Sequence, residues 1–168
     1  MTELAGRILS LEEAAAWAAE LRRQGRRVVF TNGCFDLLHR GHVAYLSEAR
    51  RLGDALVVGL NGDRSVAALK GPGRPLVPAE DRAAVLAALR AVDAVVIFED
   101  LTAEAVVAAL QPDVYVKGGD WAAGDRRPPE AAVVERYGGR VVYLPYLPGR
   151  STSSLVARIR EGQVDASP

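Results

Sequence analysis

The chain has 168 residues, of which 49% are hydrophobic, and its 21 basic side chains balance its 21 acidic ones. These values are typical of one globular domain with a core of its own. The balanced charge disfavours a general binder of nucleic acid or of anionic membrane surfaces. A single cysteine excludes an internal disulfide framework and a multi-cysteine metal site. No apolar segment approaches the roughly 20 residues that a membrane-spanning helix needs, and no signal peptide is evident, so we expect a cytoplasmic protein.

The first predicted element is a helix that leads into the main domain. Ser10 is a suitable hydroxyl cap, the acidic residues Glu12 and Glu13 follow it, and Gly25 ends the helical pattern. This segment is too short to be a domain. We therefore expect a lead-in helix packed on the domain (1–26), one main domain (27–162) and a frayed polar tail (163–168).

Apolar runs of strand length then alternate with helical patterns. The predicted buried strands are 28–30, 55–60, 94–98, 114–116 and 141–144. The predicted helices lie at about 41–53, 65–69, 78–89, 102–110, 129–137 and 155–159, the fourth of them capped by Thr102. This alternation predicts an α/β fold with a single Rossmann-like, doubly wound, parallel five-stranded sheet and helices on both faces. Ligands of such sheets bind beyond the carboxyl ends of the strands.

Small, polar and basic residues follow the predicted strands at this edge. They form the segments 31–33, 61–64, 117–120 and 151–153. Glycines permit close backbone approach, and hydroxyl groups and helix N-termini donate hydrogen bonds to phosphate oxygens. Lys70 and Lys117 add positive charge. The pattern therefore predicts a ligand that carries a polyphosphate.

The chain has only two histidines, and both lie at the start of the second predicted helix. His39 and His42 are three residues apart, which places both imidazoles on one face of the first helical turn. Two donors at a helix N-terminus suit the charge that develops at phosphorus in phosphoryl chemistry. The sequence has neither a P-loop motif nor Gly-x-Gly-x-x-Gly after the first strand, so a P-loop NTPase and a dinucleotide oxidoreductase are disfavoured.

Several stretches resemble one known family. Residues 31–42, TNGCFDLLHRGH, resemble the signature of the cytidylyltransferase-like nucleotidyltransferase superfamily, and GRSTSS at 149–154 resembles its C-terminal phosphate-binding motif. Within it, LKGPGRP at 69–75 and VKGGD at 116–120 are most similar to D-glycero-β-D-manno-heptose 1-phosphate adenylyltransferases. Many members carry a ribokinase-like sugar kinase before this domain. Because 168 residues leave no room for one, the resemblance is to the stand-alone enzyme.

The resemblance implies a reaction and its participants. ATP and heptose 1-phosphate would give ADP-heptose and pyrophosphate by in-line attack of the sugar phosphate on the α-phosphorus, with no covalent enzyme intermediate. Mg²⁺ would be held mainly by the ATP phosphates, with no metal site built from protein side chains. The expected partners are small-molecule substrates and a second copy of the chain in a homodimer. Neither nucleic acid nor a membrane is expected.

The resemblance also implies residue roles. His39, His42 and Lys70 would be catalytic, and the two histidines would stabilise the transition state and the departing pyrophosphate. The nucleotide would be bound by Thr31, Asn32, Gly33, Cys34, Phe35, Gly41, Asn61, Asp63, Arg64, Lys117, Gly118, Asp120, Arg150, Ser151, Thr152 and Ser153. Arg150 stands where sister families more often have isoleucine, so its role stays open, as do those of Arg74 and Trp121.

Other interpretations also fit the sequence. The chain could be a cytidylyltransferase for a small polyol phosphate such as glycerol 3-phosphate, a nucleotide-binding regulator without catalysis, or a protein with a structural, pH-sensing histidine pair. Cys34 is expected to be a packing residue, because no charged partner for a thiolate is evident. Asp36 could hydrogen-bond its own turn. Trp121 could line a sugar pocket or cover a loop.

Overall fold

A six-stranded parallel sheet forms the centre of the computed structural model, which describes residues 6–121 and 126–162. The strands run across the sheet in the order β1, β4, β3, β2, β5, β6, and every neighbouring pair is parallel. Their bounds are β1 Arg7–Ile8, β2 Val28–Gly33, β3 Ala55–Asn61, β4 Ala94–Phe98, β5 Val114–Gly118 and β6 Arg140–Leu144. The doubly wound parallel architecture predicted from the sequence is confirmed.

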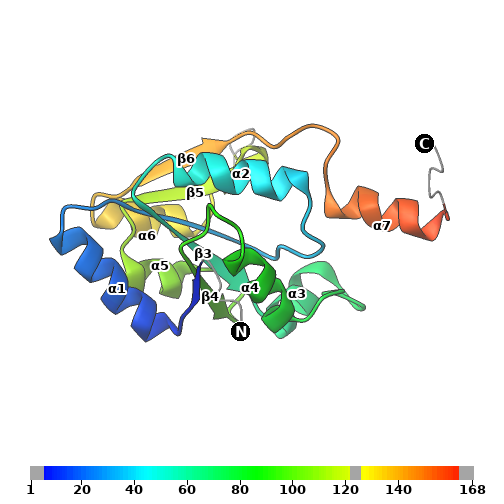
Figure 1. Ribbon diagram of the computed structural model, residues 1–168, viewed down its shortest axis with the longest axis horizontal. Coiled ribbons are helices and arrows are strands. Elements are labelled where there is room, and N and C mark those ends of the chain that lie inside the picture. The colour runs from blue at the N-terminus through cyan, green and yellow to red at the C-terminus, as the bar shows by residue number, and fades with distance from the viewer. Residues whose placement is uncertain (1–5, 122–125, 163–168) are drawn as a thin grey trace.

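Helices cover both faces of this sheet (Figure 1). One face packs against α1 Leu11–Arg23, α5 Glu104–Leu110 and α6 Glu130–Arg136, and the other against α2 Arg40–Arg50 and α4 Ala79–Ala87. The remaining helical elements are α3 Asp63–Lys70, the short 3₁₀ turn η1 Gly119–Trp121 and α7 Thr152–Arg160. Alternate residues of the central strand β2 supply the two cores, Val28 and Phe30 on the first face and Val29 on the second.

The sheet has one strand more than the five that were predicted. The additional strand, β1, is two residues long and pairs with β4 at the edge of the sheet. It precedes α1 in the segment that was expected to hold only the lead-in helix. A two-residue strand carries no periodicity that a sequence can show. Its position depends on a close contact instead, because a Cβ at Gly6 would lie 2.6 Å from the Val92 carbonyl oxygen.

The predicted N-terminus of α5 was also wrong in detail. Thr102 does not cap this helix; its hydroxyl donates to Glu104 Oε2, and Ala103 is the N-cap residue without a side-chain cap. The Ala103 N–H instead donates to Oε1 of Glu130, at 2.7 Å. Glu130 is only 2% exposed and lies at the start of α6. The cap therefore comes from a residue that is distant in sequence.

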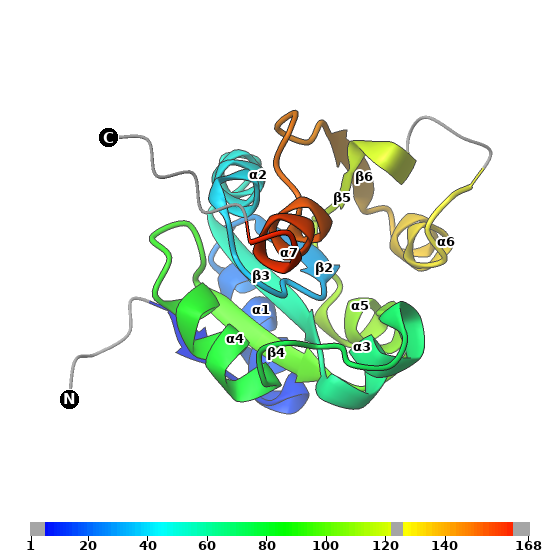
Figure 2. The ribbon, with the colours of Figure 1, turned by 90° about the vertical axis from the view of Figure 1, so that its right-hand side faces the viewer.

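The order of the strands fixes where a ligand can approach. The chain moves outward from β2 through β3 and β4 on one side, and returns to pair β5 and β6 on the other side. β2 and β5 therefore flank the point at which the order reverses, and crevices form at the carboxyl ends of such strands. Figure 2 shows α7 in front of β2 and β3, with α2 above it and α4 below it.

No helix within 6–121 and 126–162 is long and apolar enough to cross a membrane. The predicted frayed tail at 163–168 lies outside the described residues, as does the beginning of the predicted lead-in segment.

Candidate active site

The two histidines cap the N-terminus of α2 between them. His39 is the N-cap residue, and its Nδ1 accepts a hydrogen bond from the Gly41 N–H at 3.0 Å. Nδ1 of His42 accepts from the His39 N–H at 3.3 Å. Their rings are stacked with centroids 3.9 Å apart. Two imidazoles thus make the reciprocal cap that a hydroxyl and a carboxylate make in other helices.

These hydrogen bonds determine where each neutral ring carries its proton. Because Nδ1 accepts in both rings, the proton of the neutral imidazole is on Nε2. Each of His39 and His42 therefore offers an Nε2–H donor on the side of the ring opposite its bond to the backbone. A pair of adjacent donors results.

Both histidines are neutral at physiological pH. Burial, and then the positive Arg150, lower the pKa of His39. Burial, and then the neighbouring His39, lower the pKa of His42 to about 4. A neutral imidazole donates a hydrogen bond without carrying charge, so the site acts through oriented donors, and the nearby arginine and lysine side chains supply the positive charge.

We expect the ring protons of His42 to titrate with a midpoint at a pKa of about 4 in the ligand-free protein. Because unfolded histidine has a pKa of about 6.5, the unfolded chain binds this proton first, and the free energy of unfolding falls as the pH drops from about 6.5 toward 4. An NMR titration of the histidine Cε1 protons measures the midpoint. A midpoint for both rings at about 6.5 would contradict the burial that the structure shows.

Gly41 allows the histidines and the start of α7 to approach each other closely. A Cβ at this position would lie 2.8 Å from His39 Cε1 and 3.1 Å from Arg150 Cβ. Arg150 directly precedes the N-cap residue of α7 and is the charge that lowers the pKa of His39. The structure therefore places Arg150, whose role the sequence left open, beside the histidines.

The N-terminus of α7 faces the loop before α2. Ser151 is its N-cap residue and accepts from the Ser154 N–H at 3.1 Å. The Thr152 hydroxyl donates to the backbone oxygen of Asp36 at 2.7 Å. Ser153 is exposed in the first turn. Two helix N-termini, those of α2 and α7, thus lie at one site, and both favour an anion.

Asp36 joins this region to the loop after α3. Its side chain is buried and accepts from Arg74 Nε at 3.0 Å and from the Leu76 N–H at 2.8 Å through Oδ2. Oδ1 accepts from the Val77 N–H at 3.1 Å. Asp36 therefore binds the neighbouring loop and not its own turn. The backbone oxygen of Asp36 also accepts the hydrogen bond from the Thr152 hydroxyl, which connects this loop to α7.

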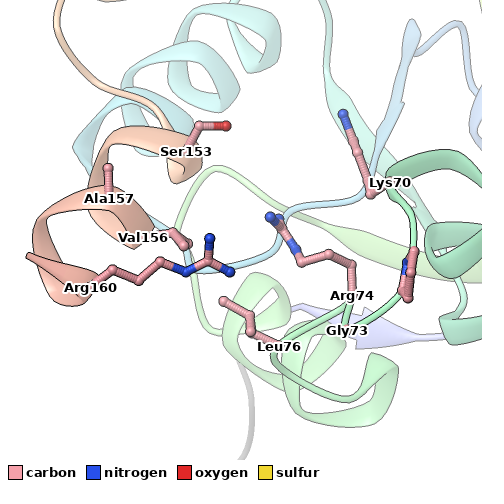
Figure 3. A pocket seen from close by; sticks show the side chains of 9 residues that line it. Lys70, Gly73, Arg74, Leu76, Ser153, Val156, Ala157 and Arg160 are labelled. Atoms are coloured by element: carbon pink, nitrogen blue, oxygen red, sulfur yellow. The ribbon is translucent and has the colours of Figure 1, made fainter.

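A pocket of about 380 Å³ opens between α7 and this loop. It is lined by Lys70, Pro72, Gly73, Arg74, Leu76, Ser153, Val156, Ala157 and Arg160. Figure 3 shows basic side chains on both sides of it, Lys70 at the end of α3 and Arg74 in the loop on one side and Arg160 of α7 on the other. The predicted residues Lys70 and Ser153 thus face a common space, whereas Arg160 was not foreseen.

A buried cation, Arg82 of α4, holds the strand ends in position. Its side chain is 2% exposed and donates to the backbone oxygens of Val77, Cys34 and Asn61 at 2.8, 2.6 and 2.8 Å. Its Nη2 also contacts Asp63 Oδ1 at 2.8 Å. One guanidinium thus fixes the loop after β2, the end of β3, the start of α3 and the loop before α4.

A second polar cluster lies on the α5 and α6 side of the sheet edge. Asn32 Oδ1 accepts from the Tyr115 hydroxyl at 2.7 Å and from Lys117 Nζ at 3.2 Å. The Lys117 ammonium also lies 5.3 Å from the centroid of the Trp121 ring. The predicted nucleotide residues Asn32 and Lys117 are thus brought together, at the point where β2 and β5 diverge.

The side chains of two predicted nucleotide-binding residues, Thr31 and Asn61, form hydrogen bonds inside the protein. Thr31 is fully buried, and its hydroxyl is hydrogen-bonded to the hydroxyl of Tyr45 and donates to the Val116 oxygen. Asn61 is buried, and its amide donates to Ser65 Oγ at 2.8 Å. Thr31 lies within β2 and Asn61 is the last residue of β3, and both side chains point into the protein and connect neighbouring elements.

Other predicted residues lie near the site with different roles. Cys34 is partly buried, and burial raises the pKa of its thiol, which keeps it protonated and agrees with a packing role. Phe35 packs its ring against His42 with centroids 5.4 Å apart, and a Cβ at Gly33 would lie 3.1 Å from that ring. Gly118 lies directly under Tyr146, whose ring and hydroxyl occupy the space that a Cβ would take.

Three charged residues, Asp63, Arg64 and Asp120, were predicted to bind the nucleotide, and among the described side chains neither Asp63 nor Arg64 has an observed contact with the histidines. Asp63 is bound to Arg82, and Arg64 is largely exposed, 4.0 Å from Glu99. Asp120 lies in η1, but its side chain is outside the described part of the structure. The nucleotide contacts predicted for Arg64 and Asp120 stay predictions.

Sequence reasoning missed Arg82, although a signal for it exists. Ala79, Ala83 and Leu86 are spaced to form the buried stripe of α4, and Arg82 falls within that stripe. A buried arginine needs several acceptors, so its place in an apolar stripe predicts a cluster of backbone oxygens around it.

The side chains at the histidines do not form a metal site of their own. Among the described residues, no group of three or more histidine, cysteine or acidic side chains could hold a metal ion. The buried Asp36 already accepts hydrogen bonds from Arg74 and two backbone N–H groups.

Comparison with protein families and with curated proteins gives consistent matches. A family model described as cytidylyltransferase-like matches residues 30–146. The chain is 48% identical over 155 residues to the bifunctional protein HldE of Methylobacillus flagellatus, which covers 92% of this chain and 31% of that protein. It is 52% identical over 151 residues to the bifunctional protein HldE of Streptomyces coelicolor, and this match covers 90% of this chain and 32% of that protein. The chain therefore spans about a third of the length of these relatives.

Solved structures show the same architecture. A lipopolysaccharide core biosynthesis protein from Thermoplasma volcanium superposes with a TM-score of 0.59 at 28% identity, covering 73% of this chain and 98% of that one. A pantoate-beta-alanine ligase from Francisella tularensis has a TM-score of 0.57 at 14% identity, covering 89% of this chain and 69% of that one. The second likeness shows the fold alone.

Proposed function

The chain belongs to the cytidylyltransferase-like family and is a nucleotidyltransferase enzyme, and on this premise we propose that it transfers AMP from ATP to D-glycero-β-D-manno-heptose 1-phosphate. An oxygen of the sugar phosphate attacks the α-phosphorus of ATP in line. A new P–O bond forms, the bond to the β-phosphate oxygen breaks, and pyrophosphate leaves. The products are ADP-heptose and pyrophosphate, and no bond to the enzyme forms.

The observation that carries this proposal is the paired cap of α2. His39 and His42 each direct Nδ1 to a backbone N–H, which leaves two adjacent Nε2–H donors for oxygens around phosphorus. Charge grows on these oxygens as the leaving bond breaks, so donors fixed in advance stabilise the transition state more than the ground state. Neither imidazole is the nucleophile.

Positive charge at the same site supports the approach of two anions. A sugar phosphate must reach an already negative triphosphate, and this repulsion needs nearby cations. Arg150 lies beside His39 and Gly41, and Lys70 faces the first turn of α7 across the pocket. Bound Mg²⁺ would supply further charge neutralisation on the phosphates.

The identity of the sugar rests on similarity. The motifs at 69–75 and 116–120 resemble those of heptose 1-phosphate adenylyltransferases, and relatives named HldE are 48% and 52% identical. The structural neighbour from Thermoplasma volcanium is a lipopolysaccharide core biosynthesis protein. These relatives support a sugar phosphate as the acceptor.

Pyrophosphate release with defined substrate pairs tests the assignment. We expect turnover with ATP and D-glycero-β-D-manno-heptose 1-phosphate, and at least about tenfold lower kcat/KM with CTP or with glycerol 3-phosphate, because a site that hydrogen-bonds one substrate leaves groups unpaired with another. Mass spectrometry of the product identifies ADP-heptose. Turnover with CTP and glycerol 3-phosphate and none with the first pair would assign the alternative cytidylyltransferase activity.

A homodimer is part of the proposal. The edge strand β1 and the adjoining helix α4 expose Ile8 and Val85, which are 45% and 50% accessible. Apolar side chains at a sheet edge favour a protein partner over water.

A further inference from the structure

One stripe of α7 forms a wall of the 380 Å³ pocket. Ser153, Val156, Ala157 and Arg160 are spaced by three, one and three residues, so they share one face of the helix. Helical side chains lean toward the N-terminus, which lets the long Arg160 side chain reach back along this face toward Ser153. Figure 3 shows the Arg160 guanidinium directed into the pocket, toward that of Arg74.

The cations of this pocket are unequally neutralised. Arg74 contacts the buried carboxylate of Asp36 at 3.0 Å. Within the described parts of the chain, neither Lys70 nor Arg160 makes a hydrogen bond or an ion pair, and Asp36 is the one carboxylate in contact with a lining residue. Lys70 and Arg160 are therefore two positive charges without a carboxylate partner among the described residues, and both line a pocket that begins at the helix N-terminus of α7.

We propose that Arg160 is a further phosphate-binding residue of this enzyme, and that together with Lys70 it binds the pyrophosphate portion of the nucleotide in this pocket. The inference rests on the proposed nucleotidyl transfer and deepens it. A diphosphate group has more charge than the acceptor's single phosphate, so it gains more from two cations and a Ser153 hydroxyl that line the same pocket. The same contacts would hold pyrophosphate until it leaves.

The chain offers a matched control on the same helix. Arg158 carries the same charge near the same helix end and is exposed, but it lies off the stripe that lines the pocket. R160Q and R158Q therefore change net charge and helix electrostatics equally. Because both side chains are exposed, both variants should keep the thermal unfolding midpoint of the wild type.

Calorimetric titration with inorganic pyrophosphate, at constant Mg²⁺ and ionic strength, tests the proposal. We expect R160Q to raise the dissociation constant about tenfold or more, as loss of one charge-assisted hydrogen bond does, and R158Q to raise it less than about twofold. Inorganic phosphate, titrated in parallel, should bind the wild type more weakly and lose less affinity in R160Q.

Three results would overturn the inference: no pyrophosphate binding by the wild type, equal losses in R160Q and R158Q, or a loss in R160Q confined to inorganic phosphate. The last would assign the pocket to the acceptor's phosphate. The two proposals fail separately. If pyrophosphate binds through Arg160 but no ADP-heptose forms, the sugar assignment is wrong and the pyrophosphate subsite stands. If ADP-heptose forms but R160Q and R158Q have equal dissociation constants for pyrophosphate, the subsite is wrong and the sugar assignment stands.

Discussion

His42→Ala should slow turnover about a hundredfold or more while the dissociation constant for ATP changes only several-fold. The substitution removes one Nε2–H donor of the pair that we propose to bind oxygens at the reacting phosphorus. That donor gains strength as charge develops in the transition state, so its loss affects kcat more than binding. Single-turnover kinetics and equilibrium titration with ATP measure the two quantities separately.

The control for His42→Ala concerns the helix cap. His42 Nδ1 accepts from the His39 N–H, so alanine also removes a capping bond worth about 1 kcal/mol. His42→Asn retains an acceptor at a similar place without an imidazole, and should recover stability without recovering rate. Equal losses of ATP affinity and of rate would refute the catalytic role. A loss of stability alone would favour the structural histidine pair.

Arg82→Met should lower the free energy of unfolding by about 3 kcal/mol or more, the largest stability effect that we expect of a single substitution around the candidate site. Methionine fills much of the volume but leaves the buried carbonyl oxygen of Asn61 and the partly buried carbonyl oxygens of Cys34 and Val77 without their donor. Each unsatisfied buried group costs about 1–3 kcal/mol. Urea unfolding followed by circular dichroism measures the change.

Activity and a matched variant make the Arg82 result specific. Because Arg82 holds the loop that leads from β2 to His39, Arg82→Met should also reduce kcat under conditions where the variant is still folded. Arg90→Met is the control, since Arg90 is exposed and forms no hydrogen bond or ion pair with the described residues; it should change stability by no more than about 0.5 kcal/mol. Similar stability for the two variants would contradict the role of Arg82 as a clamp.

Elements with a strong local pattern were predictable. All five apolar runs became strands. β3 is buried along its whole length as predicted, whereas β6 lies at the edge of the sheet and has no fully buried residue, so the prediction of a buried strand at 141–144 was wrong. The Ser10 cap was confirmed with its capping box to Glu13. β1 could not be predicted, because two residues have no period and their pairing depends on the distant strand β4. The cap of α5 was missed for the same reason, since it belongs to Glu130 in another helix.

At the candidate site, the sequence indicated which residues gather and not which way they point. His39, His42, Arg150 and Ser153 were predicted together and lie around one site. The side chain of Thr31 points the other way, because alternate residues of a strand face opposite sides and the turn decides where this alternation ends. Arg82 was the exception, a buried cation that the helical spacing alone could have revealed.

The helix α7 has no buried residue. The Thr152 hydroxyl binds the Asp36 backbone oxygen, Leu155 and Val156 are half-buried, and no α7 residue belongs to either hydrophobic core, so α7 can move away without opening these cores. The cost of such a local opening is far smaller than that of unfolding the domain. The N-terminus of α7 can therefore move away from the site and return, while the histidines stay fixed at the start of α2. In the proposed reaction, local opening of α7 would let the leaving group exit without a change in the position of the histidines.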